Sequence, residues 1–218
     1  MFKAILFDLD GTLLNTLIDL AEAMNASLVY FGFKPHSVEA FKYFVGESVE
    51  VEARRALPES ARDNRTVKKV AEYSQQIYAN CWQKHTKPYP GIPELLDELQ
   101  HRGLRLAILS NKIDSFTKIM AEKLLPQWRF DVIQGALPGV ALKPHPDLAL
   151  RIVTQLKIPS EQFLYLGDSN IDMRTAVAAG MYPVGCLWGY RTADELLKDG
   201  ARALISTPAE LLKILEAQ

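Results

Sequence analysis

The chain has 218 residues, of which 48% are hydrophobic and 23% are charged, and its 25 basic and 26 acidic side chains give a formal net charge of −1. This composition is typical of a globular protein with one large domain or two modest ones, and it excludes a disordered or fibrous chain. The balanced charge argues against a broad basic surface for polyanions, so we expect neither a nucleic-acid partner nor a membrane partner.

The cysteines and the N-terminal segment both predict a cytoplasmic protein. Cys81 and Cys186 are the only two cysteines, too few for a disulfide framework and without the spacing of a zinc site. The first apolar run ends at Asp8 and is too short for the apolar segment of a secretory signal.

In chain order, short apolar runs alternate with amphipathic stretches, a pattern typical of a parallel sheet flanked by helices. The predicted strands are apolar enough to be buried on both faces: residues 3–8, 104–110, 130–134, 162–167 and 183–187. The predicted helices cover residues 93–102, 113–125, 145–157 and 170–180. A last strand at 202–205 and a helix at 208–217 close the sheet edge. We therefore predict an α/β fold with a doubly wound, mostly parallel, Rossmann-like sheet.

Residues 15 to 87 break this alternation, because they carry three helical patterns, near 15–31, 36–57 and 63–84, and no convincing strand. Three prolines and a glycine in residues 88–93 then end the insertion, as in a stiff linker. We predict two domains, an α/β core of residues 1–14 and 89–218 and an all-α insertion of residues 15–88.

The first predicted strand ends in two carboxylates that share one site. Side chains alternate along a strand, so Asp8 and Asp10 point the same way while Leu9 points into the core. Ligands of open α/β sheets bind beyond the carboxyl ends of the strands, and Gly11 has the backbone freedom to turn the chain there. This position is the one expected for catalytic groups.

Four segments resemble, in order, the four motifs of the haloacid dehalogenase superfamily in its phosphatase branch. Residues 7–13 (Phe-Asp-Leu-Asp-Gly-Thr-Leu) resemble the first motif and residues 106–112 the second. Lys143-Pro144 resembles the third, and residues 167–172 (Gly-Asp-Ser-Asn-Ile-Asp) resemble the fourth. The resemblance covers the whole chain. It implies that the core is catalytic and that the insertion is the helical cap of the subgroup that includes phosphoglycolate phosphatases.

The resemblance also implies a magnesium site, because it brings Asp8, Asp10, Asp168 and Asp172 to one sheet edge. Close carboxylates need a neutralising cation, and Mg²⁺ accepts oxygen ligands while keeping waters and binding phosphate oxygens. In the family, the ligands correspond to Asp8, the main-chain carbonyl of Asp10, and Asp168. Asp172 would be a direct or water-mediated ligand.

The same resemblance assigns the catalytic roles. Asp8 would be the nucleophile that forms an aspartyl-phosphate, and Asp10 would be the general acid and base. Ser110, Asn111 and Lys143 would bind the transferring phosphoryl group. From residue type alone, Ser110 also fits a helix cap, and Lys143 also fits a solvated surface residue.

We therefore expect a Mg²⁺-dependent phosphatase that acts on a small phosphorylated metabolite, with phosphoglycolate first among the substrates. The alternatives are a sugar-phosphate mutase similar to β-phosphoglucomutase, and a non-catalytic protein that binds phosphate esters. Either a monomer or a homodimer is compatible with the sequence.

Two further segments each have two interpretations. Residues 188–191 follow the fifth strand, where they either shape the site entrance or pack under the last helix, and we favour packing. Residues 45–48 (Val-Gly-Glu-Ser) resemble the substrate-facing segment of the cap or form an ordinary helix-breaking turn. The four histidines show no metal-binding spacing.

Overall fold

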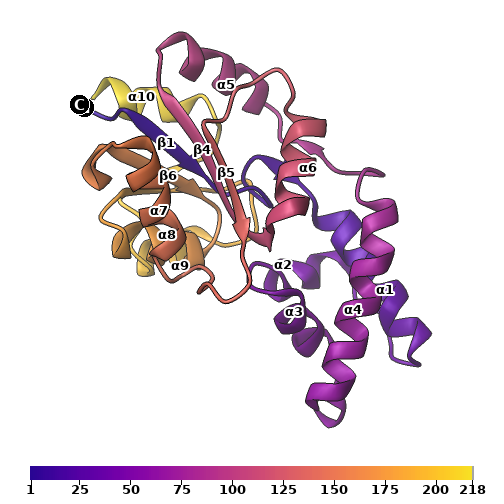
Figure 1. Cartoon of the computed structure of the whole chain (residues 1–218). Helices are drawn as coiled ribbons and strands as arrows, with labels where there is room; N and C mark the ends of the chain where they lie inside the picture. The colour runs from indigo at the N-terminus through magenta and orange to yellow at the C-terminus, as the bar shows by residue number, and fades with distance from the viewer. Residues whose placement is uncertain (218) are drawn as a thin grey trace. The chain divides into compact units, whose positions relative to one another are not determined.

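The computed structural model describes residues 1–217 (Figure 1). The chain divides into two compact units. Unit 1 is Met1–Leu14 together with the chain from Pro88 onward, and unit 2 is Asn15–Lys87. Among the described residues, no helix has both the length and the apolar character that crossing a membrane requires.

Unit 1 is built on a six-stranded sheet with the order β5-β4-β1-β6-β7-β8, in which every neighbouring pair is parallel. Because the chain order reverses on either side of β1, this strand marks the topological switch point at which such sheets bind ligands. The predicted doubly wound α/β fold is confirmed. The strands are β1 (Ala4–Phe7), β4 (Arg105–Ile113), β5 (Val132–Ala136), β6 (Phe163–Gly167), β7 (Tyr182–Cys186) and β8 (Ala203–Ile205).

Both faces of the sheet are covered, which explains the continuous apolar runs of its strands. On one face, Leu6 of β1 and Tyr165 of β6 are fully buried in a core cluster with residues of α7 and α8. Ile5 and Phe7 face the other side by strand alternation and are also fully buried. The helices of this unit are α5 (Ile92–His101), α6 (Asp114–Leu124), α7 (Asp147–Leu156), α8 (Asn170–Ala178), α9 (Ala193–Lys198) and α10 (Glu210–Glu216).

The end of β4 differs from the prediction. The strand was expected to end at Ser110, but it continues to Ile113 with a shift of register against β5 after Leu109. Helix α6 begins at Asp114, and its N-cap residue is Ile113. Ser110 is therefore not the cap of this helix, and residues 110–112 lie in an irregular extension of the strand.

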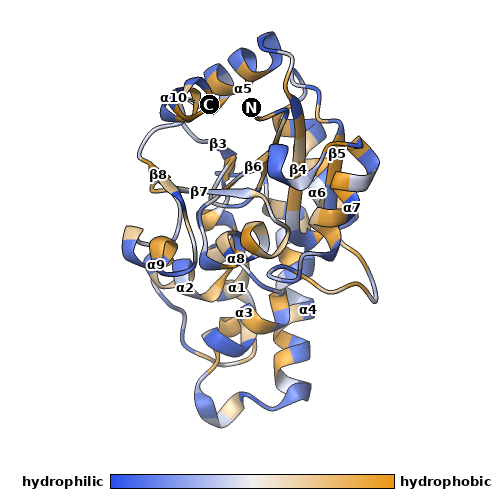
Figure 2. Cartoon of the chain, turned by 90° about the vertical axis from the view of Figure 1, so that its left-hand side faces the viewer, coloured by the Kyte–Doolittle hydropathy of each residue, from blue (hydrophilic) through white to orange (hydrophobic). Residues whose placement is uncertain are grey.

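Unit 2 is helical, and its elements are α1 (Leu17–Tyr30), η1 (Val38–Ala40), α2 (Phe41–Phe44), α3 (Val49–Ala56), η2 (Glu59–Ala61) and α4 (Asn64–Cys81). Two short strands, β2 (Leu14–Asn15) and β3 (Lys87–Pro88), form a separate two-stranded sheet. In Figure 2, α4 and α5 carry both hydrophilic and hydrophobic colours, as expected of helices that bury one side.

The single helix predicted at residues 36–57 is wrong. Val45 is extended and Gly46 has a φ of +112°, so the helical path stops after α2. The Ser48 hydroxyl then caps α3 by accepting a hydrogen bond from the Val51 N–H at 3.3 Å. Residues 45–48 form the break.

Candidate active site

Three carboxylates converge beyond the carboxyl ends of β1 and β6. Asp8 follows β1, Asp168 follows β6, and Asp172 lies in the first turn of α8. Each of the three offers a carboxylate oxygen that lies within 4.8 Å of the others, and all three residues are buried. The neighbouring parallel strands β1 and β6 therefore bring together acids that are far apart in the sequence.

Lys143 lies among these acids. Its Nζ is 2.7 Å from Asp8 Oδ1 and 2.7 Å from Asp172 Oδ1, and it donates to the Leu109 carbonyl at 3.1 Å. Because Lys143 is only 4% exposed, the interpretation as a solvated surface lysine is wrong. The Asn111 side chain fixes the Lys143 backbone, donating to its carbonyl at 3.1 Å and accepting from its N–H at 2.9 Å.

Donors that the sequence prediction missed hold Asp168 in place. The Thr12 hydroxyl donates to Asp168 Oδ1 at 3.1 Å, and the Tyr190 N–H donates to Asp168 Oδ2 at 2.8 Å. The indole Nε1 of Trp188 donates to the Thr12 carbonyl at 3.0 Å. Residues 188–191 therefore contact the acidic site directly, which the favoured packing interpretation did not include.

Asp172 is held by donors on both carboxylate oxygens. Oδ2 accepts from the Ser169 N–H at 3.1 Å and from the Ser169 hydroxyl at 2.6 Å, which is one half of a capping box at the start of α8. Oδ1 accepts from the Tyr165 hydroxyl at 3.2 Å in addition to Lys143. The spacing Ser-x-x-Asp signals such a box in a sequence, whereas the contact with Tyr165 has no local signal.

Glycines allow the chain to pass close to Asp168. A Cβ on Gly11 would lie 2.4 Å from Asp168 Oδ2, and a Cβ on Gly189 would lie 2.2 Å from the Asp168 Cβ. Gly11 also has a φ of +87°, in the left-handed region that side chains disfavour. The turn after Asp10 and the loop after β7 therefore need glycine to approach this acid.

Burial and neighbouring charges shift the pKa values of Asp8, Asp168 and Lys143. Burial raises the pKa of Asp8 well above its usual value, and the charges of Asp172 and Asp168 add to this, while Lys143 opposes it. Burial, with the charge of Asp172, raises the pKa of Asp168 to about 7. Burial lowers the pKa of Lys143, but Asp172 and Asp8 outweigh it, so the pKa is raised and the ammonium stays charged.

Asp10 lies next to this cluster but has different neighbours. Its Oδ2 is 3.1 Å from Lys112 Nζ, with side-chain exposures of 20% for Asp10 and 11% for Lys112. Its Oδ1 is buried and has no hydrogen-bond partner among the described residues. The structure thus places all the predicted site residues near the carboxyl ends of β1, β4 and β6, and it adds Lys112, to which the sequence prediction assigned no role.

The donor set fits a hard divalent cation. The cluster of Asp8, Asp168 and Asp172 offers oxygen ligands only, which Mg²⁺ and Ca²⁺ prefer. Burial and the neighbouring acids both disfavour the charged forms of Asp8 and Asp168, and a cation of two positive charges would stabilise those charged forms. The unpartnered Asp10 Oδ1 is a further polar atom beside the cluster that lacks a donor within the described chain.

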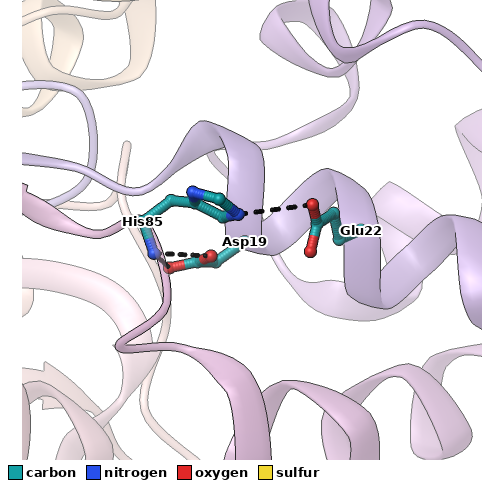
Figure 3. Close-up of side chains that lie close together, drawn as sticks. All are labelled: Asp19, Glu22 and His85. Atoms are coloured by element: carbon teal, nitrogen blue, oxygen red, sulfur yellow. Dashed lines mark hydrogen bonds and ion pairs between the residues drawn. The ribbon is translucent and has the colours of Figure 1, made fainter.

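Unit 2 contains a second group of ionisable side chains, Asp19, Glu22 and His85 (Figure 3). The Asp19 carboxylate accepts from the His85 N–H at 3.1 Å, and from the Thr86 N–H at 2.8 Å and the Thr86 hydroxyl at 2.7 Å. His85 Nε2 is 3.4 Å from Glu22 Oε1. Because Asp19 is buried and has these donors, it fastens the segment after α4 to α1.

Comparison with known proteins identifies the family of this chain. A family model described as haloacid dehalogenase-like hydrolase matches residues 5–186. A phosphoglycolate phosphatase of Aquifex aeolicus is 30% identical over 214 residues, which cover 98% of this chain and 97% of the relative. A phosphoglycolate phosphatase of Pseudomonas fluorescens strain Pf-5 is 32% identical over 93% of this chain and 78% of the relative.

Solved structures share the architecture. A protein of Lactobacillus delbrueckii subsp. bulgaricus has a TM-score of 0.93 and 32% identity, with 98% of each chain covered. A haloacid dehalogenase-like family hydrolase of Streptococcus pneumoniae has a TM-score of 0.88 and 25% identity, again with 98% of each chain covered. These matches cover 98% of this chain and so extend over residues of both units.

Proposed function

Since the chain belongs to the haloacid dehalogenase-like hydrolase family and is a phosphoric monoester hydrolase, we propose that it hydrolyses phosphoglycolate with Mg²⁺ and through an aspartyl-phosphate intermediate. The observation that carries this proposal is the contact of one buried ammonium, Lys143, with Asp8 at the switch point of the sheet. The support for the substrate is the activity of the two curated relatives.

Asp8 is the proposed nucleophile. Lys143 holds Asp8 through Oδ1, so we assign the attack on phosphorus to Oδ2. The new bond between Oδ2 and phosphorus forms as the bond from phosphorus to the leaving oxygen breaks, and the electron pair stays on that oxygen. Asp10 donates a proton to the leaving oxygen, and later accepts one from the water that attacks phosphorus and releases Asp8.

The other predicted residues bind the phosphoryl group in this proposal. Negative charge spreads over the phosphoryl oxygens during transfer, so fixed donors and cations stabilise it. The Ser110 oxygen accepts a hydrogen bond from the Lys112 N–H at 3.1 Å, which leaves its own hydroxyl hydrogen available to a phosphoryl oxygen. Lys143 supplies a charge with little solvent around it, and Asn111 keeps the backbone of Lys143 in place.

Magnesium would be held by Asp8, Asp168 and the Asp10 main-chain carbonyl, with Asp172 as a direct or water-mediated ligand, and it would supply positive charge to the phosphoryl oxygens. The inserted residues 15–88 are proposed to act as a cap that selects the leaving group. A cytoplasmic location agrees with the two free cysteines. The mutase and binding-protein alternatives have no such support from the relatives reported above.

Phosphate release from phosphoglycolate, hexose phosphates, pentose phosphates and nucleotides tests the proposal. We expect phosphoglycolate to give the highest kcat/KM, with activity that requires Mg²⁺ and is abolished by EDTA. A chain that converts one hexose phosphate into another without releasing phosphate would be a mutase. A chain that binds phosphoglycolate in titration calorimetry but never turns it over would be a binding protein.

A further inference from the structure

Lys112 makes the ion pair that distinguishes Asp10 from the other acids of the site. Its Nζ lies 3.1 Å from Asp10 Oδ2, while Lys143 contacts Asp8 and Asp172 instead. The site thus contains two ammonium groups that contact different carboxylates. The following inference rests on the proposed role of Asp10 as general acid and base.

The backbone of Lys112 is fixed on both sides. Its N–H donates to the Ser110 hydroxyl at 3.1 Å, and its carbonyl accepts from the Thr117 hydroxyl at 3.1 Å. It lies in the irregular end of β4, within the segment where the register shifts, from which the side chain reaches Asp10. Nζ also lies 5.9 Å from the centre of the Phe116 ring, a distance at which a cation is attracted to an aromatic face.

The backbone of Asp10 is fixed as well. Asp10 forms a β-bridge with Leu14, and the Gly11 N–H donates to the Leu14 carbonyl at 2.9 Å. The remaining freedom of Asp10 is rotation of its side chain, and the ion pair with Lys112 restricts that rotation. With 11% and 20% side-chain exposure, this pair is also better shielded than an ordinary surface pair.

The two oxygens of Asp10 have unequal surroundings. Lys112 contacts Oδ2, whereas Oδ1 is buried without a hydrogen-bond partner among residues 1–217. A buried carboxylate oxygen without a donor is costly, so such an atom is expected to meet a donor in the working complex. The hydroxyl of the departing alcohol and the attacking water are both donors of that kind.

We propose that Lys112 is a positioning residue, which holds Asp10 by Oδ2 so that Oδ1 faces the oxygen that gains or loses the proton. Lys112 acts through Asp10 and does not itself bind the substrate. A misplacement of about 1 Å in a catalytic group costs up to about a hundredfold in rate. Loss of the ammonium should therefore lower kcat and leave KM nearly unchanged.

Three single variants test whether Lys112 positions Asp10. Lys112→Met removes the charge but keeps the length of the side chain, and Lys112→Arg keeps the charge. Lys118→Met is the matched control, because Lys118 pairs with Asp114 at 2.7 Å on the following helix with 50% side-chain exposure. We expect Lys112→Met to lower kcat by about tenfold to a hundredfold with KM within about twofold. Lys112→Arg should restore most of the rate, and Lys118→Met should match the wild type.

A double variant decides whether Lys112 acts through Asp10. In an Asp10→Asn background, adding Lys112→Met should lower kcat no further, because the residue that Lys112 positions is already disabled. The same fold loss in both backgrounds would overturn the proposal. A rise in KM with unchanged kcat for the single variant would overturn it too, since Lys112 would then bind the substrate. If Lys112→Met fails to fold, Lys112→Gln replaces it with the same expected ratios.

The wild-type chain tests the proposed function separately. If it hydrolyses another phosphomonoester and not phosphoglycolate, the proposed substrate is wrong, and the same kcat ratios are measured with that ester. If it hydrolyses no phosphomonoester at all, both the proposed function and the role of Lys112 are wrong.

Discussion

Replacing Lys143 by methionine should destabilise the fold at neutral and alkaline pH, in addition to stopping catalysis. Methionine has a similar length but no charge, so the substitution removes the ammonium that lies 2.7 Å from both Asp8 and Asp172. Both acids remain buried, and Asp168 stays within 4.8 Å of them. The variant therefore keeps three crowded carboxylates without their cation.

The size of the effect follows from this geometry. Removing one partner of a buried ion pair costs about 3–5 kcal/mol, because the remaining charge stays out of water. For a chain of this length, each kcal/mol lowers the melting temperature by about 2–4 °C, so we expect a decrease of about 6–20 °C. The loss is partly offset wherever the acids can take up a proton instead.

The pH dependence of this loss has a defined sign. Burial and the neighbouring acids raise the pKa of Asp8, and Lys143 lowers it. Without Lys143, we expect the pKa of Asp8 to be higher still. A carboxyl whose folded pKa exceeds its unfolded value stabilises the fold at low pH, and this contribution is lost as the pH rises through the folded pKa. The stability gap between wild type and variant therefore widens as the pH rises and narrows as it falls.

Thermal and urea denaturation followed by circular dichroism, in EDTA at pH 8 and pH 5, measure this gap. Lys118→Met is again the control, since it breaks a pair with Asp114 in which the lysine side chain is 50% exposed, and it should change stability little. Equal stability of Lys143→Met and the wild type at pH 8 would contradict this prediction. A stability gap that is wider at pH 5 than at pH 8 would contradict it too.

Three further predictions concern the same site. Asp8→Asn should abolish phosphate release while the circular dichroism spectrum stays unchanged, and substantial Mg²⁺-dependent turnover would contradict the nucleophile assignment. Gly11→Ala should cost about 1–3 kcal/mol in urea denaturation, because the added Cβ would lie 2.4 Å from Asp168 Oδ2. Gly32→Ala, with a φ of +82° but nothing within 4 Å, should cost less. Mg²⁺ should stabilise the chain more at pH 8 than at pH 5, because burial and Asp172 raise the pKa of Asp168 to about 7 and a metal needs the deprotonated acid. An equal melting-temperature rise at both pH values would contradict this.

The sheet was predictable because its strands are buried on both faces. The expected strand at residues 162–167 corresponds to β6 (Phe163–Gly167), in which every residue is buried. A continuous apolar run of this kind indicates a strand that is buried on both faces of the sheet. By contrast, α9 has only six residues, too few for a helical period to show, and it was not predicted.

Backbone geometry accounts for the errors in element boundaries. Hydrophobic spacing favoured one helix through residues 36–57, but the positive φ of Gly46 and the cap formed by Ser48 divide it. At the end of β4, the chain stays extended through residues 110–113, where the shift of register occurs. Spacing alone does not predict a local register shift, because the shift depends on the neighbouring strand.

The acids of the site were predictable, but most of their partners were not. Asp8 and Asp168 directly follow strands in recognisable motifs, and the sequence therefore indicates where they lie. The Tyr190 N–H that reaches Asp168 is a backbone group, so its residue type gives no signal. Lys112 belongs to the second motif, but its contact with Asp10 depends on the extension of β4 beyond Ser110, which the sequence did not predict.

The donors around the two acids of the fourth motif favour different roles for them. A carboxylate offers about four lone-pair sites, and Asp172 receives hydrogen bonds from Lys143, Tyr165 and both polar groups of Ser169. These donors leave Asp172 less capacity for a direct bond to a cation. Among the described residues, Thr12 and Tyr190 donate hydrogen bonds to Asp168, which leaves lone pairs for a cation. Asp172 is therefore better suited to orienting Lys143 and contacting a metal through water, while Asp168 is better suited to binding it directly.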